Sequence, residues 1–117
     1  MGFMSGFVEG FFFNTDNRTY WLPQHFGLKA KRFKTTSAAG HKIAGLILES
    51  KKKETVGTIF FFTPALYNFS FNIGQAAFLT DYGFNVLMFD YSGSGGSQGR
   101  STIAGLKSDA QAVWDWF

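Results

Sequence analysis

The sequence predicts an α/β domain with a mixed sheet, in which an antiparallel hairpin precedes parallel strands connected by crossover helices. Two continuous apolar runs, at residues 58–62 and 85–89, have the pattern of strands that are covered on both faces, as in parallel sheets. A helical pattern follows each run. Upstream, two strand-like segments flank a short turn that contains glycine, which is typical of a β-hairpin.

Length and composition fit one globular domain. The chain has 117 residues, of which 45% are hydrophobic and 16% are charged. Its net charge of +3 is small, so we expect no nucleic-acid partner. The absence of cysteine excludes disulfides and thiolate metal sites. The carboxylates are scattered without a histidine at ligand spacing, so neither a metal nor another cofactor is expected.

The hairpin is expected to pair residues 30–36 with residues 42–49, through a turn at residues 37–41. Four basic side chains cluster on and beside its first strand: Lys29, Lys31, Arg32 and Lys34. We interpret them as a solvated sheet edge that resists aggregation, with an anion-binding patch as the alternative. Lys51, Lys52, Lys53 and Glu54 form a polar loop after the hairpin.

The first apolar run should end at Pro64, which cannot donate to a sheet ladder. A helix is predicted over residues 72–82, and Gly83 supplies its left-handed C-terminal stop. The residues predicted for its inner face are Ile73, Ala76, Ala77 and Tyr82.

A second helix is predicted to begin at Ser101 and Thr102, which are good N-cap residues. Its apolar residues at helical spacing, expected to face the sheet, are Ile103, Leu106, Ala110, Val113, Trp114 and Phe117.

The N-terminal residues 2–13 are apolar but shorter than a membrane span, contain Glu9 and lack a basic start. We therefore expect neither a membrane helix nor a secretory signal. Membrane association through this segment stays open as an alternative to simple packing, so the compartment is either cytoplasmic or membrane-associated.

Residues 95–99 read G-G-S-Q-G and fit the pattern G-x-S-x-G, which would make Ser97 a nucleophile. A nucleophile elbow needs its serine on a sharp turn between a strand end and a helix start. Here the strand should end near Asp90, and the helix begins several residues after Ser97, so we predict that Ser97 is not the nucleophile. Asp90 is expected to accept hydrogen bonds from local backbone donors. The glycines could alternatively cradle a phosphate, as in a dinucleotide-binding domain.

The chain resembles the N-terminal part of α/β-hydrolase fold proteins, in particular the serine-aminopeptidase-like, Bem46-related group. Residues 89–99, F-D-Y-S-G-S-G-G-S-Q-G, are similar to that group's F-D-Y-R-G-x-G-x-S-x-G, with Ser92 in place of arginine. Residues 82–87, Y-G-F-N-V-L, and the lead-in R-T-Y-W-L-P at residues 18–23 also resemble it. The implied division is a lead-in segment at residues 1–28 and the N-terminal portion of a hydrolase domain at residues 29–117.

The resemblance also implies where catalysis would occur. In that group the nucleophile, acid and histidine come from later segments, so the Ser-His-Asp triad is expected downstream of Phe117. Backbone N–H groups of Ala65 or Leu66 would form the oxyanion hole. The group's His-Gly-Asn-Ala-Gly-Asn is T-P-A-L-Y-N here, at residues 63–68, so only the final asparagine is kept.

The resemblance thus implies an N-terminal fragment of a serine hydrolase that cleaves a small-molecule ester or amide. A non-catalytic binding module of the same fold is the first alternative, and a dinucleotide-binding domain is the second. Because the group's sheet order would leave residues 58–62 at an edge, the fragment is expected to self-associate through that strand.

Overall fold

The computed structural model describes residues 14–63 and 66–117. The apolar segment at residues 2–13 lies outside the described residues, and so do Pro64 and Ala65. Expectations that concern these positions stay predictions.

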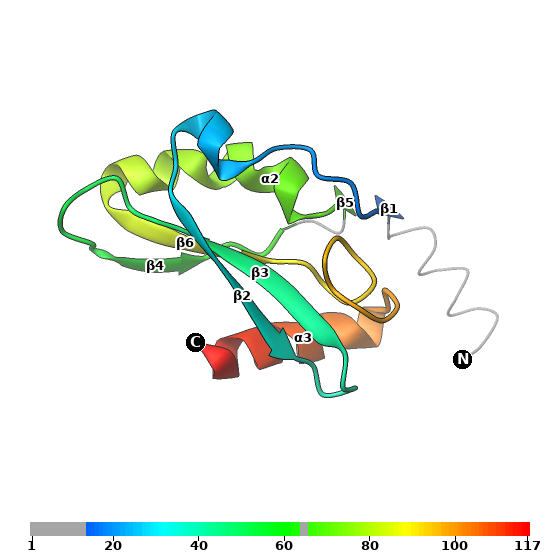
Figure 1. The fold of residues 1–117 in the computed structure, drawn as a ribbon. Coiled ribbons are helices and arrows are strands. Elements are labelled where there is room, and N and C mark those ends of the chain that lie inside the picture. Colours follow the sequence, from blue (N-terminus) through cyan, green and yellow to red (C-terminus); the bar gives the residue numbers. More distant parts are fainter. Residues whose placement is uncertain (1–13, 64–65) are drawn as a thin grey trace.

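A four-stranded mixed sheet forms the middle layer of the fold (Figure 1). Its order is β2 (Ala30–Thr36), β3 (Lys42–Leu48), β6 (Phe84–Phe89) and β4 (Gly57–Phe60). The β2–β3 and β3–β6 pairs are antiparallel, whereas β4 and β6 are parallel. The predicted fold class, an antiparallel hairpin followed by parallel strands, is therefore confirmed.

The hairpin forms as predicted, with a register that runs from the pair Ala30↔Leu48 to the pair Thr36↔Lys42. Its second strand ends one residue earlier than expected. The four basic side chains on and beside β2 are exposed, and β2 is an edge of the sheet. Charge at this position hinders pairing with another chain.

The strand β4 is shorter and less buried than the sequence predicted. It ends at Phe60, and all four of its residues are half-buried. This half-burial shows that the expected coverage on both faces is wrong. The expected position at an edge is confirmed, since among the described residues β4 has only β6 as a neighbour in its sheet. Phe62, just beyond the strand, is 54% exposed.

The predicted first helix consists of two parts, α2 (Phe69–Ala76) and the 3₁₀ helix η2 (Ala77–Tyr82). It begins three residues earlier than predicted because the Asn68 side chain caps it, accepting a hydrogen bond from the backbone N–H of Ser70. Gly83 has φ 92°, which confirms the left-handed stop. Tyr82 is 64% exposed, so its inward placement is wrong.

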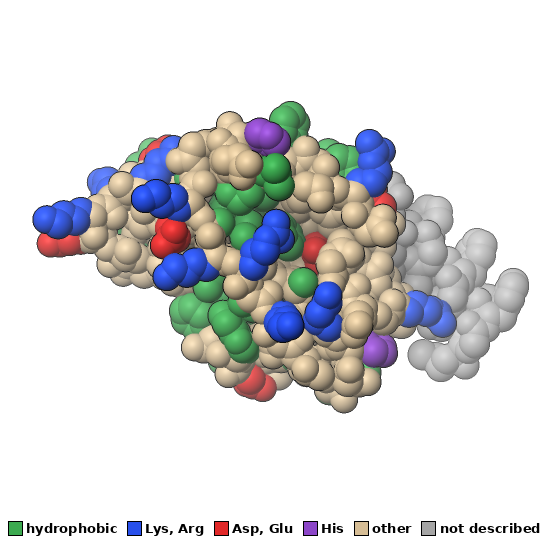
Figure 2. Space-filling model, viewed as in Figure 1, with side chains coloured by type: hydrophobic (Ala, Val, Ile, Leu, Met, Phe, Trp, Pro, Cys, Tyr) green, Lys and Arg blue, Asp and Glu red, His purple; other side chains and the backbone are tan. Residues whose placement is uncertain are grey.

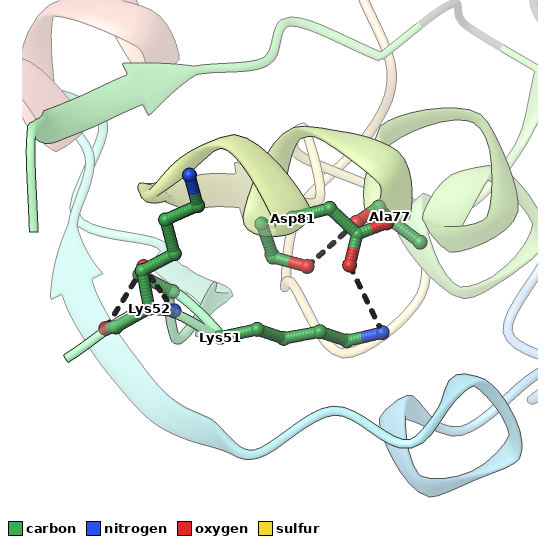
Figure 3. Close-up of polar contacts among 6 residues, drawn as sticks. Lys51, Lys52, Ala77 and Asp81 are labelled. Carbon is green, nitrogen blue, oxygen red and sulfur yellow. Dashed lines mark hydrogen bonds and ion pairs between the residues drawn. The ribbon is translucent and has the colours of Figure 1, made fainter.

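The polar loop between β3 and β4 is exposed from Lys51 to Val56 and is joined to the end of η2. Lys51 Nζ lies 3.3 Å from Asp81 Oδ1 (Figure 3). The backbone N–H of Lys51 also donates to the carbonyl oxygen of Thr80. An exposed ion pair of this kind contributes about 1 kcal/mol or less, so the backbone contact is at least as important for holding the loop.

The C-terminal helix α3 (Ile103–Trp116) covers the opposite face of the sheet from α2 (Figure 1). As predicted, a residue of the Ser101–Thr102 pair caps it: the Thr102 side chain accepts from the N–H of Gly105. Only part of the expected apolar stripe faces inward. Val113 is buried, but Ile103, Trp114 and Phe117 are 51%, 64% and 61% exposed, which corrects their placement.

The hydrophobic core has one part on each face of the sheet. The buried residues on the α2 side include Leu46, Leu48, Ile73, Ala76, Val86 and Met88. Those on the α3 side are Ile43, Leu87, Phe89 and Val113. The alternation of inward side chains along β3 and β6 supplies both parts.

The lead-in residues pack on the fold as an extended segment. The two-residue strand β1 (Asn14–Thr15) pairs in parallel with β5 (Leu66–Tyr67), and the 3₁₀ helix η1 (Pro23–Phe26) precedes β2. In the described part of the chain, no helix combines the length and the apolar character that crossing a membrane requires.

Candidate functional site at the carboxyl edge of the sheet

Two chain segments leave the sheet at the carboxyl ends of its parallel strands. One runs from the end of β4 to the start of α2, and the other runs from β6 to α3 (Figure 1). Their contact is direct, since the Ser94 hydroxyl donates to the carbonyl oxygen of Tyr67 at 3.0 Å. Open α/β sheets place their sites at this edge.

The hydroxyl of Ser97 is hydrogen-bonded to β3 and to the residue that follows β6. Ser97 Oγ donates to the carbonyl oxygen of Asp90 at 2.5 Å and accepts from the backbone N–H of Ala44 at 2.9 Å. The residue lies in the loop between β6 and α3, seven positions after Asp90. These contacts fix the loop against β3. That Ser97 is not a nucleophile stays a prediction.

The backbone donors of the glycine-rich loop are also used within the protein. The N–H groups of Gly93 and Ser97 donate to Gln98 and Ser94 carbonyls. The N–H groups of residues 95, 96 and 98 donate to Asp16 O, Asp90 Oδ2 and Lys42 O, respectively. A phosphate cradle needs free N–H groups. This geometry therefore disfavours the dinucleotide-binding alternative.

Asp90 accepts hydrogen bonds from backbone N–H groups, as expected, and joins the segment before α2 to the loop after β6. Its Oδ1 accepts from the N–H of Phe69 at 2.7 Å, at the start of α2, and its Oδ2 accepts from the N–H of Gly96 at 3.1 Å. Gly95 lies so close that a Cβ there would stand 2.0 Å from Asp90 Oδ2. The side chain is only 4% exposed. Burial raises the pKa of Asp90 to about 6, although the two N–H donors and Arg32 act in the opposite direction.

This pKa predicts an unusual pH dependence of stability. Because the folded-state pKa is raised from 3.8, ionising Asp90 costs about 3 kcal/mol in the folded protein. The contribution of protonated Asp90 to the free energy of unfolding is complete below about pH 4 and is lost as the pH rises through about 6. We expect the free energy of unfolding to be about 2 kcal/mol higher at pH 4.5 than at pH 7.5 from this group alone.

Urea unfolding across that pH range measures the effect, with Asp90→Asn as the comparison. The asparagine removes the titration while the other charged groups near the site, Arg32 and Asp16, remain. The difference between the two curves isolates Asp90. If the free energy of unfolding depended on pH in the same way in both proteins, ionising Asp90 would cost nothing in the folded state.

Asn68 is the most heavily bonded side chain of the site. It is 4% exposed and caps α2 through Oδ1. Its Nδ2 donates to Asp16 Oδ1 at 2.9 Å, to the carbonyl oxygen of Arg18 at 2.6 Å and to that of Asp16 at 3.3 Å. The asparagine that the sequence shares with the hydrolase pattern thus ties the lead-in segment to the start of α2.

The two oxyanion-hole candidates are only partly placed. Ala65 lies outside the described residues. The backbone of Leu66 lies in β5, paired with Asn14 of β1, and the next residue, Tyr67, has φ 57°. A positive φ at a bulky residue is uncommon and marks a backbone held by its surroundings. The role of either N–H as an oxyanion donor stays a prediction.

Two carboxylates of the site were not predicted from sequence. Asp16 accepts from Asn68 and from the Tyr20 hydroxyl, and its backbone oxygen accepts from Gly95. Asp109 is 2% exposed in α3 and accepts from both the N–H and the hydroxyl of Ser92, at 2.7 and 2.9 Å. A weak signal existed for Asp109, since it interrupts the apolar stripe of a helix that covers a sheet. No group of three or more histidine, aspartate or glutamate side chains within residues 14–63 and 66–117 could hold a metal ion.

Comparison with solved structures shows that this chain has part of the α/β-hydrolase fold. The esterase Pf2001 of Pyrococcus furiosus superposes with a TM-score of 0.65 at 22% identity, covering 88% of this chain and 41% of the esterase. The match therefore covers most of this chain but less than half of its structural neighbour.

Sequence comparison finds shorter matches. An uncharacterized protein of Mycobacterium tuberculosis, Rv2307c, is 46% identical over 41 residues, which are 35% of this chain and 15% of that protein. The human protein ABHD12B is 50% identical over 38 residues, which are 32% of this chain and 10% of that protein. The chain thus matches only a small part of these relatives. No protein-family model matches it.

Proposed function

We propose that residues 1–117 are the N-terminal part of a serine hydrolase of the α/β-hydrolase fold, within the serine-aminopeptidase-like group. The observation that carries the proposal is the extent of the structural match, since 88% of this chain corresponds to 41% of an esterase. The whole protein would hydrolyse a small-molecule ester or amide, with its Ser-His-Asp triad on segments that follow Phe117.

The chain's own part in this reaction would be structural and electrostatic. Asn68 and Asp90 fix the start of α2. Ala65 and Leu66 precede it in the chain, and we assign the backbone N–H of one or the other to the oxyanion hole. Donors on a fixed backbone stabilise the developing negative charge of a tetrahedral intermediate without reorganising during the reaction. In the same proposal, residues 29–117 belong to the hydrolase domain, and the N-terminal segment is a candidate for membrane association.

Labelling with a fluorophosphonate probe tests this proposal. The probe should leave the 117-residue chain unmodified because the Ser97 hydroxyl is already hydrogen-bonded on both sides. A longer protein from the same reading frame should be labelled at a serine that follows Phe117, with mass spectrometry identifying the position. Ser97→Ala in that longer protein should retain the labelling.

The outcomes distinguish the candidates. Labelling of Ser97 itself would overturn the assignment of the nucleophile. A folded longer protein that takes up no probe, and whose next strand is not followed by G-x-S-x-G, would instead support the non-catalytic binding module.

A further inference from the structure

A cavity of about 200 Å³ opens between the lead-in segment and the α2-facing side of the sheet. Buried apolar side chains form its floor: Leu46, Phe69 and Ile73. Trp21, Leu22 and Pro23 form a wall on the lead-in side. The space-filling view shows apolar side chains in the middle of this face, with basic side chains beside them (Figure 2). The cavity is smaller than the roughly 300–1,000 Å³ of pockets for drug-sized ligands, so it fits a small molecule.

Three charged residues line the cavity, and two of them are engaged elsewhere. Asp90 points its carboxylate at the N–H groups of Phe69 and Gly96. The guanidinium of Arg18 lies 5.1 Å from the centre of the Tyr20 ring, a cation–π contact.

Arg32 differs from both. Its side chain is exposed on β2, and it makes no hydrogen bond or ion pair with any residue that the structure describes. Within the described residues, the cavity thus presents the Arg32 guanidinium, without a hydrogen bond or ion pair, beside an apolar floor. The lining carries two basic side chains, Arg18 and Arg32, and one acidic side chain, Asp90, so it favours an anion over a cation.

We propose that this cavity binds a small monocarboxylate whose apolar body is a short alkyl chain. The carboxylate lies on the Arg32 guanidinium, whose planar fork matches the two carboxylate oxygens. The apolar body packs on Leu46 and Ile73 and is thereby removed from contact with water. A single free guanidinium suits a carboxylate better than a phosphate, because the neighbouring backbone donors, Gly95 and Gly96, are already used.

The proposal does not depend on hydrolytic activity. All the residues that it uses belong to the lead-in segment, the hairpin, α2 and the loop after β6. Binding can therefore be measured on the present chain whether or not a longer protein is an enzyme.

Saturation-transfer NMR with octanoate tests the proposal on the full 117-residue chain fused to a solubility partner. The method observes the ligand and therefore works on a large or oligomeric protein. The partner alone provides the blank. Octanol tests the requirement for the carboxylate, and acetate tests the requirement for the apolar body.

Two substitutions on β2 provide the matched comparison. Arg32→Gln removes the guanidinium and should weaken octanoate binding at least tenfold. Lys31→Gln removes the same charge from the neighbouring position, which does not line the cavity, and should change binding less than twofold. Both side chains are exposed, so neither change should unfold the chain.

A third substitution tests the position of the apolar body. Ala44 lines the cavity, and Ala44→Leu should fill part of it and also abolish binding. Octanoate binding that is absent from the wild-type fusion, or that is equal in Arg32→Gln and wild type, would overturn the proposal. Equal binding of octanol would show that the cavity selects for apolar shape and would also reject the carboxylate assignment.

Discussion

The 117-residue chain, produced alone, is expected to sediment as oligomers held through the open edge of β4, and Thr58→Lys is expected to shift it to monomers. Among the described residues β4 pairs only with β6, so its other edge presents unpaired backbone groups. No charged residue lies within Gly57–Phe60. Unprotected edges of this kind pair with other chains.

Aromatic side chains beside this edge increase the tendency to associate. The Phe60 ring contacts those of Phe62, Trp114 and Phe117, with centroid distances of 6.4, 5.2 and 5.0 Å. The latter three residues are more than half exposed. Burying a large apolar side chain contributes about 1.5–3 kcal/mol, so covering three of them is comparable to the whole stability of a small domain.

Sedimentation velocity at several concentrations measures this prediction. Gln75→Lys is the control, because it adds the same charge on the exposed side of α2, away from β4. It should leave the oligomers unchanged. The prediction fails if the unmodified chain is a monomer with a sharp cooperative melt, or if both lysines have the same effect.

The second large effect is expected for Asn68→Ala, which should lower the free energy of unfolding by about 2–4 kcal/mol. Loss of an N-cap costs about 1 kcal/mol. The change also removes the hydrogen bonds from Asn68 to Asp16 Oδ1 and to the carbonyl oxygen of Arg18, and each hydrogen bond of this kind contributes about 0.5–1.5 kcal/mol.

Urea unfolding in the monomeric Thr58→Lys background measures this loss, and the same background suits the pH titration of Asp90. Asn17→Ala is the matched control, because Asn17 is exposed and its side chain makes no hydrogen bond to any residue that the structure describes; it should change stability by less than about 0.5 kcal/mol. Asn68→Asp separates the two roles, since aspartate keeps the cap but faces the Asp16 carboxylate. Wild-type stability in Asn68→Asp would show that the amide donors contribute nothing.

Elements whose determinants are local could be predicted from the sequence. The hairpin, β6, the Thr102 cap and the Gly83 stop follow from strand pattern, capping and the conformational freedom of glycine. The start of α2 was missed because Asn68 was assigned to a loop, although it is a good N-cap residue. Its neighbours, residues 63–67, differ from the hydrolase pattern, so only the asparagine itself marks the start of the helix.

Features that depend on distant neighbours could not be predicted. The pattern of the apolar run at residues 58–62 does not show how many strands flank it; its place at an edge was predicted from the resemblance alone, through the sheet order. The apolar stripe predicted for the last helix includes Trp114 and Phe117, but α3 ends at Trp116, faces the sheet through Val113 and buries Asp109. At the site, spacing alone predicted that Ser97 is no elbow, whereas the cavity beside Arg32 depends on the path of the lead-in segment.

That path has a consequence for how the chain folds during synthesis. The lead-in bonds from Asn68 to Asp16 and from Tyr20 to Ser70 join residues that are 52 and 50 positions apart. The β2–β3 hairpin closes over a much shorter loop, and closing a long loop costs more chain entropy before any contact is gained. Residues 14–22 leave the ribosome well before Asn68 and Ser70, so their hydrogen bonds to these residues can form only later in synthesis. We therefore expect amide hydrogens in this segment to gain protection from exchange after those of the hairpin, although they are synthesised first.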